Sequence, residues 1–190
     1  YPCDTLKFAP GRSYVDSTGM LYVWLPPGET PFGHVWNITL KNGLWLLPIP
    51  GRPRQRYVVV EGFVSQNFGL NGAAITSDFV HLFHILSKDN GRAGIAVTFC
   101  NHVLVENCEA AENEKGIGFT QGMTAYKIFG KDVVFRGNSS HNNYDGADPN
   151  HCGTDGSGFV LDTCSPDAGA LFENNIAYDN MGTGFSVYQA

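Results

Sequence analysis

The chain has 190 residues, a formal net charge of −6 and a pI of about 5.4, and only 16% of its residues are charged. Phosphate binding needs a basic stripe, so this acidic balance argues against a general nucleic-acid-binding protein. No apolar run reaches the 18 or more residues that span a bilayer, and the nearest, Leu44 to Pro50, is interrupted by Pro48.

The length fits a single domain, and 23 glycines with 13% aromatic residues are typical of a turn-rich β protein. The first residue is Tyr1 rather than Met, so we expect a processed protein or an excerpt of a longer one. Residues 1–56 show no regular pattern, and a proline- and arginine-rich loop is predicted at their end, over Pro48 to Arg56.

One asparagine recurs at the same place in five aligned stretches that follow. It is the tenth residue after the start of each stretch. The starts are Tyr57, Val80, Val103, Val133 and Ala170, and the asparagines are Asn67, Asn90, Asn113, Asn143 and Asn180. The starts are 23, 23, 30 and 37 residues apart. A period of this size indicates a solenoid, and the longer intervals indicate insertions in the later copies.

Each copy has the pattern of three short strands separated by polar turns. Alternating apolar residues open most copies, as in Val103 with Val105 and Val133 with Phe135, which predicts a strand with one buried face. Asparagine and glycine follow, and both tolerate the left-handed backbone that tight bends require. Three strands in about 23 residues predict one rung of a parallel β-helix, with the asparagines stacked along its axis.

The last copy resembles a known family. Its residues 170–187, ALFENNIAYDNMGTGFSV, are similar to the parallel β-helix repeat of the pectate-lyase-like superfamily, and the resemblance covers residues 57–188. It implies a right-handed parallel β-helix, in agreement with the handedness rule for parallel crossovers. We expect one all-β domain over residues 1–190, with five rungs in 57–190 and irregular early rungs or a cap in 1–56.

The third strands are predicted to present an outward polar column. If Ile75, Ile95, Ile117, Phe159 and Phe185 point inward, the residue three positions later points outward. The column is then Asp78, Thr98, Thr120, Asp162 and Tyr188. In proteins of the superfamily that the chain resembles, the corresponding sheet and its flanking loops bind polysaccharide. The alternative is an ordinary threonine-bearing strand face.

Two insertions are expected beside this column. The first, Gln121 to Asp132, contains Tyr126, Lys127 and Lys131, and the second, His141 to Gly158, contains Tyr144 and His151. Long loops on a rigid scaffold often contain the binding groups. The predicted substrate-binding residues are Thr120, Tyr126, Tyr144 and Tyr188. The candidate catalytic residues are Asp155, Asp162, His151, Lys127 and Lys131.

Four aspartates in or near the second insertion are candidate ligands of a calcium ion, because calcium prefers several oxygen ligands. They are Asp145, Asp148, Asp155 and Asp162. From Asp132 to the end of the chain there are eight acidic residues and one base, Arg136. This imbalance fits either a cation site or a solvated polar surface, and aspartates in turns also have backbone reasons to be there.

The resemblance implies lyase or epimerase chemistry on a uronate polymer. The run from Asp155 through Gly156 to Phe159 and Asp162 is similar to the aspartate-glycine-phenylalanine rungs of some pectate lyases. Asp162 stands where those rungs place a lysine, so the base remains open among Lys127, Lys131 and His151. Thr154 to Gly156 matches part of a polygalacturonase pattern, and Asp148-Pro149 matches the start of a mannuronan epimerase motif.

The sequence therefore predicts a secreted or cell-surface enzyme that acts on an acidic polysaccharide as a lyase or epimerase, with calcium as its candidate cofactor. A polysaccharide hydrolase is one alternative, since Asp155 and Asp162 would satisfy an inverting mechanism if they faced one groove. The other is a non-catalytic β-helix module that binds glycans or forms part of a surface or fibre protein. Glycan binding that is unchanged when Asp155 and Asp162 become alanine would favour the non-catalytic module.

The five cysteines, Cys3, Cys100, Cys108, Cys152 and Cys164, contain no CxxC pair, so a zinc ribbon is not predicted. Cys152 and Cys164 flank one predicted strand and are candidates for a disulfide in an oxidising compartment. Two triplets, at Asn37 and Asn138, fit the N-glycosylation pattern, which is frequent by chance.

Overall fold

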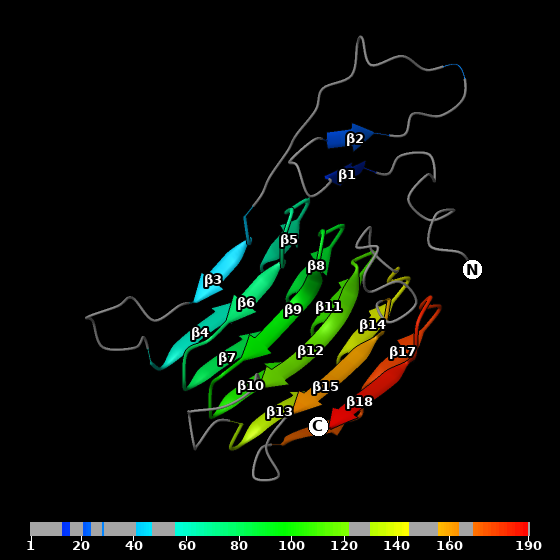
Figure 1. The fold of residues 1–190 in the computed structure, drawn as a ribbon. Helices are drawn as coiled ribbons and strands as arrows, with labels where there is room; N and C mark the ends of the chain where they lie inside the picture. Colours follow the sequence, from blue (N-terminus) through cyan, green and yellow to red (C-terminus); the bar gives the residue numbers. More distant parts are fainter. Residues whose placement is uncertain are drawn as a thin grey trace.

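The computed structural model describes residues 13–15, 21–23, 28, 41–46, 56–121, 130–144, 156–163 and 169–189. These residues form strands and turns without an α-helix. Three parallel sheets, which we call the first, second and third sheet, wind into a solenoid whose rungs stack in chain order (Figure 1). The predicted all-β parallel β-helix is confirmed.

The first sheet contains β4 (Val58–Glu61), β7 (Val80–Phe83), β10 (Val103–Glu106), β13 (Val133–Arg136) and β16 (Ala170–Glu173). The second contains β5 (Val64–Gln66), β8 (Leu86–Lys88), β11 (Glu109–Ala111), β14 (Ser139–His141) and β17 (Ile176–Tyr178). The third contains β3 (Leu44–Leu46), β6 (Ala73–Ile75), β9 (Ala93–Thr98), β12 (Lys115–Gln121), β15 (Phe159–Thr163) and β18 (Phe185–Gln189). Two further strands, β1 (Ser13–Val15) and β2 (Leu21–Val23), pair antiparallel.

The register of the first copy differs from the prediction by one residue. Val58 pairs with Val80, so the copy begins at Val58 and not at Tyr57. The tenth residue after Val58 is Phe68, whose backbone N–H donates to Asn90 Oδ1 at 3.1 Å. Asn67 therefore lies one position before the column of asparagines. The other four starts hold, because Val80, Val103, Val133 and Ala170 pair in one continuous row.

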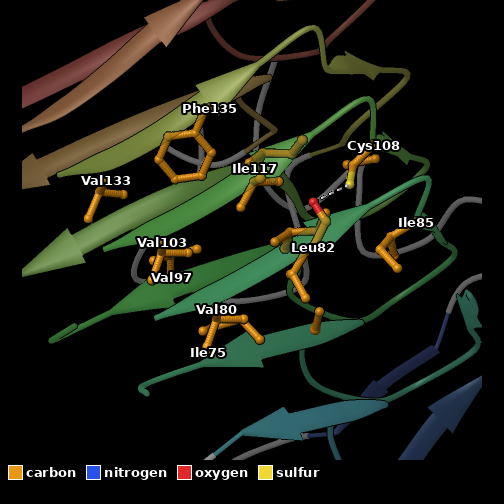
Figure 2. Packing of buried hydrophobic residues seen from close by; sticks show 14 of the residues in the cluster. Ile75, Val80, Leu82, Ile85, Val97, Val103, Cys108, Ile117, Val133 and Phe135 are labelled. Atoms are coloured by element: carbon orange, nitrogen blue, oxygen red, sulfur yellow. Dashed lines mark hydrogen bonds between the residues drawn. The ribbon is translucent and has the colours of Figure 1, made fainter. Parts of the chain in front are cut away.

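The core is a column of inward-facing side chains from the first and third sheets. Val80, Leu82, Val103 and Val105 are at most 2% exposed, and Phe135 is fully buried (Figure 2). The same inward position recurs in successive rungs, so aromatic side chains at that position stack on one another. Phe135 lies 4.6 Å from Phe172, centroid to centroid, with nearly parallel planes. The period-two burial of β7 and β10 is the pattern that the sequence predicted.

A buried asparagine ladder joins the second sheet to the third. Asn90, Asn113 and Asn143 are each fully buried, and the side-chain amide of each donates to the carbonyl oxygen of the next asparagine, ending at Asn180. The residue before each of them has a left-handed backbone, as at Asp89 (φ 53°). The ladder satisfies backbone N–H groups where the chain turns and the strand pairing is interrupted.

A glycine lies at the start of the third strand in each rung, and in three of them, at Gly43, Gly72 and Gly116, a serine from the second sheet lies against it. A Cβ at Gly72 would lie 1.9 Å from Ser87 Oγ, and one at Gly116 would lie 1.8 Å from Ser140 Oγ. Both hydroxyls are buried, and Ser87 donates to Gly94 O at 2.7 Å. This contact brings the two sheets closer than side chains on both would allow.

Candidate functional site

Strand register joins four members of the predicted polar column on the third sheet, and Thr98 and Asp162 alternate there with the buried Val97 and the inward Leu161. Thr98 pairs with Thr120, Thr120 with Asp162, and Asp162 with Tyr188, so the four residues occupy successive rungs of one column. Thr98 and Asp162 are half-buried. The predicted adjacency of Thr120, Asp162 and Tyr188 is confirmed at the level of strand register.

Asp78 does not belong to this column, and the prediction that placed it there was wrong. Ile75 pairs with Val97 rather than Ile95, so continuing the register puts Thr76 beside Thr98. Asp78 instead lies in the turn before the first sheet and is 8% exposed. Its Oδ1 accepts a hydrogen bond from the Asn101 backbone N–H at 2.9 Å, which makes it part of a turn ladder. The error arose because β6 is two residues out of step with the assumed alignment.

The two insertions lie at opposite ends of the third-sheet strands, the first at the exit of β12 next to Asp162 and the second at the entrance of β15. The chain leaves β12 after Gln121 and is described again from Gly130, and the second interval lies between Tyr144 and Gly156, just before β15. Six predicted site residues fall in these intervals, outside the described residues. They are Tyr126, Lys127, Asp145, Asp148, His151 and Asp155. Cys3, Cys152 and Cys164 also lie outside, so the candidate disulfide stays a prediction.

Lys131 lies in the turn that leads into β13, at the corner where the third sheet passes to the first. Its backbone N–H donates to Asn101 Oδ1 at 3.0 Å, and its carbonyl accepts from the His102 N–H at 2.8 Å. The residue is exposed. The backbone is thus fixed by neighbouring turns, and the side chain stands at the surface beside the first insertion.

Tyr144 lies at the opposite end of the third-sheet strands. It follows the ladder residue Asn143, is half-buried, and its backbone N–H donates to Asn113 O at 2.8 Å. Lys131 is therefore at the exit of the third sheet and Tyr144 at its entrance. The two predicted site residues bracket the strands that contain Thr120 and Asp162.

Arg136 lies on a different face. It belongs to β13, in the outward column of the first sheet, where it pairs with Glu173 and lies 3.5 Å from Glu106. The hydrogen bond and the negative charge of Glu173 raise the pKa of Arg136, and Glu106 adds to the effect. The only lysine or arginine between Asp132 and the end of the chain is thus paired with two carboxylates and lies outside the Asp162 column.

Three hydroxyl groups gather beside β15, and the sequence analysis did not single them out. Ser157, which is 2% exposed, has its Oγ 3.1 Å from Ser186 Oγ and 3.2 Å from Thr183 Oγ1. Ser157 and Thr183 stand two residues before the inward phenylalanines Phe159 and Phe185. The repeat alignment already contained that signal, but hydroxyl residues are too common in turns to be noticed there.

No group of three histidine, cysteine or acidic side chains able to hold a metal occurs among the described residues. Three of the four proposed calcium ligands, Asp145, Asp148 and Asp155, lie outside the described residues. Within the described part of the chain there is also no helix long and apolar enough to cross a membrane.

The comparison with known families agrees with this architecture. Residues 54–190, more than two thirds of the chain, match the model of the right-handed β-helix region. The chain belongs to the right-handed β-helix family. No curated protein and no solved structure matches this right-handed β-helix protein. The family fits the pectate-lyase-like superfamily that the repeat resembles, and it defines a β-helix domain without a specific substrate.

Proposed function

We propose that this right-handed β-helix protein acts on an acidic polysaccharide, as a lyase or an epimerase, at the outward face of the third sheet. The observation that supports the proposal most is the column of Thr98, Thr120 and Asp162, with Tyr188 at its end, between two insertions. A linear polymer suits a binding surface that repeats with the rung spacing of about 4.8 Å.

The chemistry starts with removal of the proton next to a uronate carboxylate. A base takes this proton, and in a lyase the bond to the leaving sugar oxygen breaks as a double bond forms. Calcium would neutralise the uronate carboxylate, with Asp162 and the aspartates of 145–155 as its proposed ligands. Asp155, His151, Lys127 and Lys131 are the remaining proposed proton-transfer groups. A polymer substrate places the protein outside the cell or at its surface.

The test is turnover of polygalacturonate and alginate, each with calcium and with a chelator. A lyase product absorbs in the ultraviolet because it contains a new double bond, whereas an epimerase leaves absorbance unchanged and alters the uronate composition seen by NMR. Asp162→Asn should lower either activity at least about tenfold. The matched control is Asp179→Asn, which changes an exposed turn aspartate with a left-handed backbone that asparagine also tolerates.

A non-catalytic glycan-binding module is the second candidate, favoured by the lack of a three-ligand metal cluster among the described residues. It predicts polymer binding without turnover, and binding that survives when both Asp155 and Asp162 become alanine. Hydrolysis remains a third expectation and would give reducing ends without ultraviolet absorbance. Unchanged polymers and an absence of polymer binding would contradict all three.

A further inference from the structure

We propose that His102 and Asp132 form a proton-transfer dyad at the corner between the third and first sheets. Asp132 Oδ2 lies 3.1 Å from His102 Nδ1. The two residues come from successive rungs, immediately before the first strands that begin at Val103 and Val133. This inference rests on the proposed function, because it supplies the proton acceptor that the proposed reaction requires.

The imidazole of His102 contacts two side chains, Asp132 and Phe79, and the backbone of His102 is fixed by a neighbouring turn. Its ring stacks on Phe79 with centroids 4.4 Å apart and planes 17° apart. Its backbone N–H donates to Lys131 O at 2.8 Å, and the backbone has a left-handed φ of 54°. Phe79 stacks in turn on Tyr57 at 4.9 Å. A bulky side chain at a left-handed position costs free energy, and ring stacking offsets part of that cost.

The Asp132 carboxylate determines which nitrogen of the His102 ring can accept a proton. A carboxylate oxygen 3.1 Å from Nδ1 repels a lone pair on that nitrogen, so it favours the neutral tautomer with the hydrogen on Nδ1 and the lone pair on Nε2. Nε2 makes no hydrogen bond or ion pair with the described residues, and the His102 side chain is 37% exposed. The ring therefore presents a proton acceptor to solvent, and the Asp132 carboxylate lies beside the ring on its other nitrogen.

The other three described histidines lack this combination. His141 uses both nitrogens, Nε2 with Glu109 and Nδ1 with Asn142, each at 3.1 Å. The Nε2 atom of His81 is buried 3.4 Å from a Glu106 oxygen. His84 lies 3.9 Å from Glu61, too far for a hydrogen bond. Among these four, only His102 has a close carboxylate at Nδ1 and an open Nε2.

The dyad lies next to the proposed binding face. His102 is four residues beyond Thr98 of the polar column, a separation that an extended chain covers in at most about 14 Å. Asp132 ends the first insertion, which begins directly after Gln121 of β12. A uronate at the exit end of the column would thus have the dyad beside it.

The proposed step balances as follows. Nε2 takes the hydrogen from the carbon next to the uronate carboxylate, and the electron pair of that C–H bond becomes part of a new double bond. In a lyase the glycosidic C–O bond breaks, and its electron pair goes to the leaving oxygen, which is then protonated by the imidazolium or by water. In an epimerase the carbon is reprotonated on its other face.

Two variants and one control test the catalytic role on polygalacturonate and alginate. His102→Gln should lower turnover on the order of 100-fold, and Asp132→Asn at least about tenfold, because the second variant loses the orienting acceptor. His84→Gln, a surface histidine at another left-handed turn (φ 53°), should keep turnover within about twofold. Thermal unfolding of all three shows whether each folds.

A measurement independent of activity tests the dyad itself. The 15N NMR signals of His102, assigned by their absence in His102→Gln, should show protonated Nδ1 and unprotonated Nε2 in the neutral ring. Asp132→Asn should shift that tautomer balance. A folded His102→Gln with wild-type turnover overturns the inference while leaving the proposed function intact, as does a proton found on Nε2. If the wild-type protein converts neither polymer, the lyase and epimerase function fails, and the catalytic role of His102 fails with it.

Discussion

Asn113 Oδ1 accepts two hydrogen bonds from Asn90, one from its side-chain amide at 2.9 Å and one from its backbone N–H at 3.1 Å. Both residues are fully buried. The amide of Asn113 also donates to Ser87 O at 2.9 Å. One side chain therefore satisfies backbone and side-chain groups of the preceding rung, which explains why the repeat keeps an asparagine here.

Replacement of Asn113 by alanine should destabilise the protein by at least about 3 kcal/mol, because it removes both buried hydrogen bonds from Asn90 to Asn113 Oδ1 and the bond from Asn113 to Ser87 O. Chemical denaturation measures this change. Asn67→Gly is the matched control, since Asn67 is exposed outside the ladder and glycine tolerates its φ of 62°. Equal stability of the two variants would contradict the ladder's role.

Gly116 and Gly118 lie two residues apart in β12 and should respond differently to alanine. A Cβ at Gly116 would lie 1.8 Å from Ser140 Oγ and 2.1 Å from Gly158 O, whereas one at Gly118 would find its nearest atom at 3.6 Å. Gly116→Ala should therefore cost about 3 kcal/mol or more or prevent folding, and Gly118→Ala should change stability by less than about 1 kcal/mol. Melting curves of the two variants decide the matter, and similar losses would refute the close packing.

Cys108 gives a pH-dependent prediction. Burial raises the pKa of its thiol from 9.0 to about 11, although hydrogen bonds from backbone groups oppose the shift. The unfolded thiol loses its proton above pH 9 while the folded thiol keeps it, so the folded state binds more protons in this window. The free energy of unfolding should therefore fall between about pH 9 and pH 11, by up to about 3 kcal/mol from this group.

The comparison with Cys108→Ala isolates this contribution, since other groups also titrate in that range. The variant should lose stability less steeply than the wild type from pH 9 to pH 11, and parallel curves would contradict the assignment. In the native protein at pH 8, Cys108 and the buried Cys100 should also resist iodoacetamide, as mapped by mass spectrometry.

The glycosylation triplet at Asn138 should stay unmodified in the folded protein. Asn138 is 1% exposed, its amide donates to Val105 O at 2.9 Å and Asn175 Oδ1 at 3.0 Å, and its Oδ1 accepts from the Cys108 N–H at 2.8 Å. A glycan on the Asn138 side-chain nitrogen would disrupt its hydrogen bonds to Val105 and Asn175. Peptide mapping of protein secreted from a glycosylating host should find Asn138 unoccupied, and a glycan there in natively melting protein would contradict the structure.

The fold could be predicted from the sequence because each rung of the solenoid needs the same residue types at the same positions, so the pattern repeats along the chain. The row Val80, Val103, Val133 and Ala170 was placed correctly from its asparagine spacing alone. The first rung failed because Phe68 occupies the asparagine's place there, and the nearby Asn67 attracted the alignment by one residue. The backbone N–H of Phe68 bonds to Asn90, and any residue type can supply such an N–H, so the sequence does not mark this position.

The candidate site could be predicted only in part, because the repeat determines the positions of some of its residues but not the side-chain contacts of others. Thr120, Asp162 and Tyr188 follow from strand register, so period two was sufficient. His102 and Asp132 also share a column, but nothing in their spacing indicates that a ring nitrogen and a carboxylate meet. Their contact depends on side-chain orientation at a left-handed turn, which period two does not describe.

A variant of Arg136 can show whether activity depends on the first sheet or on the third sheet. Arg136 is the only lysine or arginine between Asp132 and the end of the chain, which makes it a candidate for the catalytic base by composition, but it lies on the first sheet between Glu106 and Glu173. Arg136→Gln should leave polymer turnover within about twofold of wild type and lower stability by less than about 1 kcal/mol, because exposed ion pairs contribute little. Asp162→Asn, measured beside it, should lose turnover without losing stability. The opposite pattern, with turnover lost only in the Arg136 variant, would move the proposed site from the third sheet to the first.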